Sequence, residues 1–108
     1  MSYQERPRQK NRGEVLLEVA DIEQSWKAIE SRTQQIVGAT ARKMSLSAAE
    51  LQGMLEINEE SAALRIKFLA LENTNRRKNH GVLPQWLKDD RSWQQLNRIY
   101  GVQGARER

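Results

Sequence analysis

The feature that most constrains this chain is an uninterrupted heptad pattern near its start, which we call the ladder. The ladder comprises Val15, Val19, Ile22, Trp26, Ile29, Thr33, Ile36 and Thr40. Its members alternate in steps of four and three residues, so they share one face of an α-helix and not one face of a strand. A lone helix cannot bury such a face by itself. The ladder therefore predicts a protein held together by packing between helices.

Three helices are expected along the chain. The first covers about residues 14–43. The second covers about residues 47–75, and its start is marked by Ser47 and Glu50, which have the spacing of a capping box. A third and shorter helix covers about residues 84–100, because a proline suits its first turn and a glycine follows its end. No segment alternates in the manner of a strand.

The short turn around residues 44–46 favours an antiparallel arrangement of the first two helices. We therefore expect an all-α fold, a long antiparallel αα-hairpin with a shorter third helix at its C-terminal side. A length of 108 residues suits a single domain, which we place at residues 14–101. Residues 1–13 are expected to form a flexible basic arm, and residues 102–108 a frayed tail.

Two other arrangements of these helices stay open at this point. β-Branched residues at Val15, Ile22 and Ile29 would suit a parallel dimer through the ladder, although Trp26 fits a symmetric seam poorly. The second helix could also break near residues 56–58 into a helix-turn-helix that binds DNA. The acidic residues that would open its recognition helix argue against that break, and we favour a continuous helix.

Charge is distributed unevenly along the chain, whose formal net charge is +4. Residues 14–75 hold ten acidic and six basic side chains. The basic excess therefore lies in the residues before and after this stretch. Such an arrangement indicates a partner that carries negative charge, and nucleic acid is the first candidate.

The basic residues outside the long helices are the candidate nucleic-acid contacts. In an antiparallel hairpin the start of the first helix and the end of the second lie together, so basic residues of the arm and of the loop after residue 75 should converge. We also expect basic residues on the third helix to extend this surface. The candidates are Arg6, Arg8, Lys10, Arg12, Arg76, Arg77, Lys78, His80, Arg91 and Arg98.

The second helix has a broader apolar face than a two-stranded seam requires. We expect this face to contact a partner as well as the first helix, either in a homo-oligomer or with a helical protein. The residues expected at this protein interface are Met54, Ile57, Leu64, Phe68 and Leu71. They are flanked by a second apolar set, Leu51, Leu55, Ala62, Ile66 and Leu69.

Catalysis, metal binding and membrane insertion have little support in this sequence. His80 is the single histidine and lies among basic residues, there is no cysteine, and no glycine-rich phosphate loop is present. We therefore expect no catalytic residue, metal, cofactor or small-molecule substrate. No apolar run is long enough to span a membrane and no secretory signal is evident, so we expect a cytoplasmic protein. The tryptophans are expected in the core.

These observations predict a small non-enzymatic accessory or regulatory protein that binds DNA or RNA phosphates through its basic arm and loop. The alternative is a helical adaptor, a secretion chaperone or a structural subunit of a larger assembly.

Overall fold

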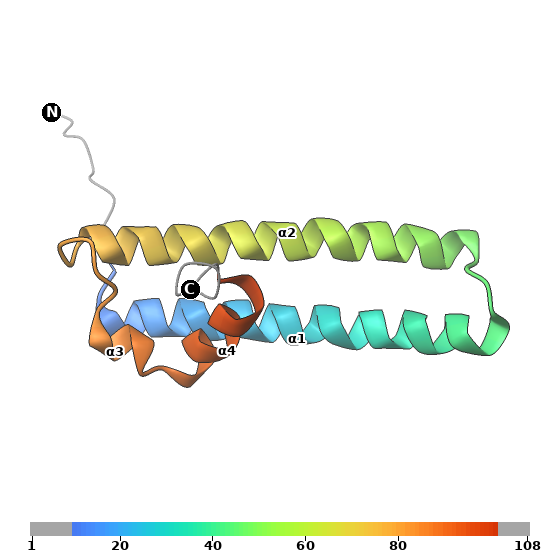
Figure 1. Cartoon of the computed structure of the whole chain (residues 1–108), viewed down its shortest axis with the longest axis horizontal. Helices are drawn as coiled ribbons and strands as arrows, with labels where there is room; N and C mark the ends of the chain where they lie inside the picture. The colour runs from blue at the N-terminus through green and yellow to red at the C-terminus, as the bar shows by residue number, and fades with distance from the viewer. Residues whose placement is uncertain (1–9, 102–108) are drawn as a thin grey trace, which may run out of the picture.

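The fold is a long antiparallel hairpin with two short helices packed on one half of it (Figure 1). The computed structural model describes residues 10–101. The hairpin consists of α1 (Arg12–Lys43) and α2 (Ala48–Arg77), and α3 (Gln85–Lys88) and α4 (Arg91–Tyr100) follow it. Residues 10–101 contain no strand. The expected all-α hairpin is confirmed, whereas the arm before residue 10 and the tail after residue 101 lie outside the described residues.

Both ends of α1 have a local cause. Asn11 caps its start, and a capping box forms because the Asn11 side chain accepts from the Glu14 N–H while the Glu14 side chain accepts from the Asn11 N–H. The helix continues past Gly38 and ends at Met44, whose φ of 62° is left-handed. The Met44 N–H donates to the Thr40 carbonyl at 2.6 Å and so closes the last turn.

The second helix starts at the expected capping box and runs without a break. The Ser47 hydroxyl accepts from the Glu50 N–H at 3.1 Å, and the Glu50 carboxylate accepts from the Ser47 N–H at 2.8 Å. Because α2 is continuous from Ala48 to Arg77, the alternative of a helix-turn-helix with a break at residues 56–58 is wrong.

The ladder faces the interior of the chain. Val15, Val19, Ile22 and Ile29 are buried, and Trp26 is half-buried. Since this face packs against α2, the alternative of a parallel dimer through the ladder is not the arrangement found.

Two helices replace the single third helix expected over residues 84–100. Asp89 and Asp90 lie between α3 and α4 and separate the two helices. Asp90 is the N-cap of α4, and its carboxylate accepts from the Trp93 N–H at 2.9 Å. A new capping residue thus restarts the helix in a different direction, which lets α4 pack on the hairpin.

The core lies in the half of the hairpin that includes the start of α1 and the end of α2. There α4 packs against both long helices, and Phe68 of α2 lies beside Tyr100 of α4 with ring centroids 6.4 Å apart. Phe68, Leu87 and Leu96 are fully buried. Toward the turn the hairpin has only two helices, and Ile57 is one of the few buried residues there.

The expected protein interface on α2 is largely inside this core. Ile57, Phe68 and Leu71 are buried, and Met54 and Leu64 are half-buried. The chain's own packing thus already covers three of the five side chains, and the expectation that this set also meets a partner stays a prediction. Among residues 10–101, no helix is long and apolar enough to cross a membrane.

Candidate nucleic-acid interface

The hairpin brings basic residues from the two sides of the sequence to one end of the molecule. The start of α1 and the end of α2 lie at the same end, on the left in Figure 1. We call this part of the molecule the basic end. Its members within residues 10–101 are Lys10, Arg12, Arg76, Arg77, Lys78 and His80.

A tight turn shapes the basic end after α2. The N–H groups of Asn79 and Gly81 both donate to the Arg76 carbonyl, at 3.0 and 2.7 Å. His80 and Gly81 have φ values of 57° and 85°, the left-handed conformation that allows the chain to reverse so quickly. The turn therefore keeps Lys78 and His80, both exposed, close to the helix end.

Arg76 and Arg77 belong to the last turn of α2 and not to the loop where the sequence placed them. Cations at this position are favoured by the partial negative charge of the helix C-terminus. Within residues 10–101, no ion pair uses Arg76, Arg77 or Lys78. These three side chains are consequently available to an external anion.

A shallow hollow lies beside these arginines. It is lined by Asn73, Arg76, Arg77 and Gly81. The Asn73 amide adds a neutral donor to the two guanidinium groups, a combination that suits phosphate oxygens. Sequence reasoning missed Asn73, although it precedes Arg76 by three residues and therefore shares its helix face.

The two basic arm residues that the structure describes, Lys10 and Arg12, are both engaged. The Lys10 ammonium pairs with Glu18 at 2.8 Å, and the Arg12 guanidinium lies over the Trp86 ring at 5.5 Å from its centroid. The Lys10 pair is exposed, so it competes only weakly with another anion. The Arg12 contact joins the start of α1 to α3. Arg6 and Arg8 lie outside the described residues.

Arg91 and Arg98 are exposed on α4. The Tyr100 hydroxyl lies 3.3 Å from the Ser61 hydroxyl, so the end of α4 is anchored far back along α2. Ser61 precedes Arg76 by fifteen residues, a distance of about 22 Å along a helix. Arg98, two residues before Tyr100, is therefore distant from the basic end, and the expectation that Arg91 extends the basic surface stays a prediction.

The three tryptophans are not open platforms for nucleic-acid bases. Trp93 is buried, and its indole N–H donates to the buried Glu72 carboxylate at 2.9 Å. Trp26 and Trp86 are half-buried and pack against the core. The indole rings therefore contribute mainly to the packing of α3 and α4 on the hairpin.

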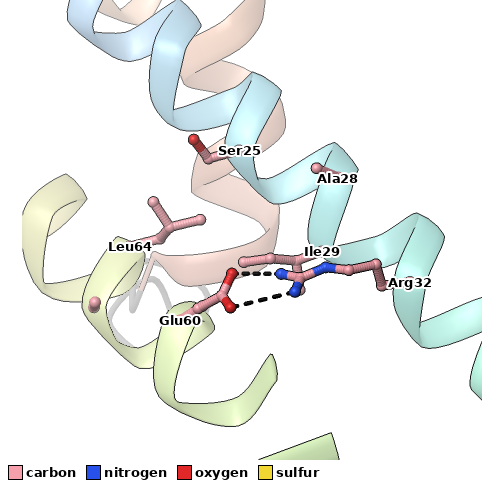
Figure 2. A pocket seen from close by; sticks show the side chains of 7 residues that line it. Ser25, Ala28, Ile29, Arg32, Glu60 and Leu64 are labelled. Carbon is pink, nitrogen blue, oxygen red and sulfur yellow. Dashed lines mark hydrogen bonds and ion pairs between the residues drawn. The ribbon is translucent and has the colours of Figure 1, made fainter. Parts of the chain in front are cut away.

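A second hollow lies between α1 and α2, away from the basic end (Figure 2). Small side chains such as Ser25, Ala28 and Ala63 leave space beside Ile29. The Arg32 guanidinium bonds both carboxylate oxygens of Glu60 across this space, and this hydrogen bonding raises the pKa of Arg32 above its ordinary value. This ion pair therefore joins α1 to α2 across the hollow.

The remaining chemical candidates of the sequence are His80 and any group of side chains that could bind a metal. His80 lies in the turn after α2, and no ion pair or side-chain hydrogen bond engages it within residues 10–101. The same residues include no group of three or more His, Asp or Glu side chains placed to hold a metal ion.

Comparisons with protein family models, with curated proteins and with solved structures found no significant match to this chain.

Proposed function

We propose that this protein is a small accessory protein that binds nucleic-acid phosphates through its basic end. The observation that carries the proposal is the group formed by Arg76, Arg77 and Lys78, which is exposed or half-exposed and has no acidic partner within residues 10–101. Lys10 and Arg12 lie at the same end of the hairpin. Several unpaired cations on one small surface attract a polyanion more strongly than they attract a single carboxylate.

The proposed contact is with the nucleic-acid backbone and not with base edges. Backbone contacts need clustered lysine and arginine side chains, whereas base readout needs a helix or ribbon placed in a groove. Only the last turn of α2 lies at the basic end. The inward face of the rest of this helix packs on α1 and α4, so that face is not free to enter a nucleic-acid groove. Binding should therefore show little sequence preference and a strong dependence on salt.

A second candidate function is that of a helical adaptor, chaperone or assembly subunit. It is favoured by apolar side chains left exposed on α2, among them Leu51, Leu55 and Ile66. The two functions use different surfaces and are compatible. The cytoplasmic location and the lack of enzymatic activity stay predictions from the sequence.

Fluorescence anisotropy with labelled duplex DNA, single-stranded DNA and RNA tests the proposal. We expect all three ligands to bind at low salt, with little difference among sequences of equal length. The triple variant Arg76→Ser, Arg77→Ser, Lys78→Ser should bind each of them at least tenfold more weakly. If wild-type protein binds none of the three at low salt, the proposed function is wrong, and the exposed face of α2 becomes the leading site.

A further inference from the structure

The hollow at the end of α2 gathers three side chains that donate hydrogen bonds. It is lined by Asn73, Arg76, Arg77 and Gly81. Arg76 and Arg77 follow Asn73 by three and four residues, so both are its neighbours on the helix surface. Helical side chains lean toward the N-terminus of their helix, which directs both arginines toward the turn that holds Asn73. The two guanidinium groups and the amide can therefore reach the same ligand.

These three side chains are free to bind a ligand. Within residues 10–101, none of them takes part in a hydrogen bond or an ion pair with another side chain. Asn73 and Arg77 are exposed, and Arg76 is half-buried. A ligand that enters the hollow breaks no contact between side chains of the protein.

The surroundings of the hollow favour an anion. Between residues 61 and 77, the one acidic residue of α2 is Glu72, which is buried and bonded to α4. Carbonyl groups at the end of a helix repel an anion when they are unpaired. The Arg76 carbonyl instead accepts from the N–H groups of Asn79 and Gly81. The positive charges of the hollow are therefore little opposed on this side of the helix.

Two guanidinium groups in one hollow match a phosphate at the end of a strand better than a phosphate inside it. A phosphate within a strand carries a single negative charge, whereas a phosphate monoester carries about −1.5 to −2 at pH 7 and has an additional free oxygen. Arginine binds such oxygens in pairs through two parallel N–H groups. The hollow has a volume of about 430 Å³, within the range of small-ligand pockets, which leaves room for the sugar that carries the phosphate.

We infer that this hollow binds the terminal phosphate monoester of a nucleic-acid strand. The inference rests on the proposed nucleic-acid function and deepens it, because it distinguishes the end of a strand from its internal backbone. A strand that ends in a phosphate should therefore bind more tightly than the same strand with hydroxyl ends.

Fluorescence anisotropy with short single strands of one sequence, labelled at an internal base, tests the inference. Separate strands carry a 5′-phosphate, a 3′-phosphate or hydroxyl ends, and a longer hydroxyl-ended strand adds one internal phosphate. We expect a terminal phosphate to tighten binding about tenfold at low salt, and the longer strand to gain about twofold at most. Comparison of the 5′ and 3′ forms shows which end enters the hollow.

The outcomes of this experiment separate the inference from the proposed function. If the strands bind at low salt but neither terminal phosphate gains more than the longer strand does, the inference is overturned and the proposed function stands. If no strand binds at low salt, both are overturned.

A neutral substitution tests whether the hollow is the site of this preference. Asn73→Ala removes one donor without changing the net charge, and it should lower the preference for a terminal phosphate about threefold. The matched control is Asn58→Ala, which alters another exposed asparagine of α2 and should keep the wild-type preference. An Asn73→Ala preference equal to that of wild type would contradict the inference.

A charge-conserving substitution tests the contribution of the guanidinium groups. Arg76→Lys, Arg77→Lys keeps both positive charges but loses the paired N–H groups, so most of the preference should disappear. Arg42→Lys, Arg65→Lys changes two exposed arginines elsewhere and should keep it. A full preference in the first double variant would show that charge alone attracts the terminal phosphate, and the inferred site would be wrong.

Discussion

The indole N–H of Trp93 donates to the carboxylate of Glu72 at 2.9 Å, and both side chains are buried. This bond joins α4 to α2 in the interior of the protein. A buried carboxylate is unfavourable unless donors satisfy it, so the indole helps to keep Glu72 inside. The position of α4 on the hairpin is thus fixed by a specific polar contact as well as by apolar packing.

Replacing Trp93 with phenylalanine removes this donor while keeping most of the ring. We expect Trp93→Phe to lower the free energy of unfolding by about 2 kcal/mol, the usual magnitude for a buried hydrogen bond to a charged group. Urea denaturation followed by circular dichroism measures this loss. The control is Trp86→Phe, which changes a half-buried ring and should cost less. Equal losses in the two variants would show that the bond to Glu72 contributes nothing specific.

Thr40 provides a prediction of increased stability. Its hydroxyl oxygen is buried and has no hydrogen-bond partner within residues 10–101, whereas the Thr33 hydroxyl donates to the Ile29 carbonyl at 2.9 Å. Thr40→Val replaces the unsatisfied hydroxyl with a methyl group of similar size. We expect it to raise the free energy of unfolding by about 1 kcal/mol. Thr33→Val, measured in the same urea titration, should bring no gain, and a loss of stability in Thr40→Val would contradict the prediction.

The capping box at the start of α2 makes stability depend on pH. Hydrogen bonds from the Ser47 backbone and from Lys43 lower the pKa of Glu50 below its ordinary value. The unfolded chain therefore takes up this proton more readily than the folded chain. The contribution of Glu50 to stability is present above the ordinary glutamate pKa and is lost as the pH falls through the lowered folded-state value.

Thermal unfolding at several pH values measures this contribution. Between about pH 5 and pH 3, the melting temperature of wild type should fall more steeply than that of Glu50→Gln. The control is Glu59→Gln, which removes a charge from an exposed position of the same helix. A Glu50→Gln profile parallel to that of wild type would show that the capping carboxylate does not contribute.

The hairpin was predictable because its determinants are local. The ladder defines one face of α1, and Ser47 and Glu50 mark the start of α2. A second signal of the same kind was missed, since Asn11 and Glu14 have the same spacing and cap α1. The break between α3 and α4 also had a local signal, because Asp90 is a favourable N-cap.

Other features depend on tertiary packing and could not be predicted from local patterns. The apolar residues of α2 surround much of the helix, so the sequence did not indicate which of them α4 would cover. Phe68 became core and Ile66 stayed exposed for that reason. Burial of Glu72 requires Trp93 of a distant helix, and no local pattern in the sequence specifies that contact.

In the proposed function, the three basic residues at the end of α2 contact phosphates. Two variants of equal net charge distinguish a local phosphate-binding site from general electrostatic attraction between the protein and DNA. The first is Arg76→Ser, Arg77→Ser, Lys78→Ser, which alters the basic end. The second is a control that removes three exposed arginines elsewhere, Arg42→Ser, Arg65→Ser and Arg98→Ser.

The most direct measurement is the dependence of duplex-DNA affinity on salt for wild type and both variants. Each phosphate contact contributes about 0.9 to the slope of log K against log salt concentration. We expect the slope of the basic-end variant to be smaller than that of wild type by about 2 to 3, while the control keeps a slope near the wild-type value. Equal slopes in the two variants, or an unchanged slope in the basic-end variant, would contradict this expectation.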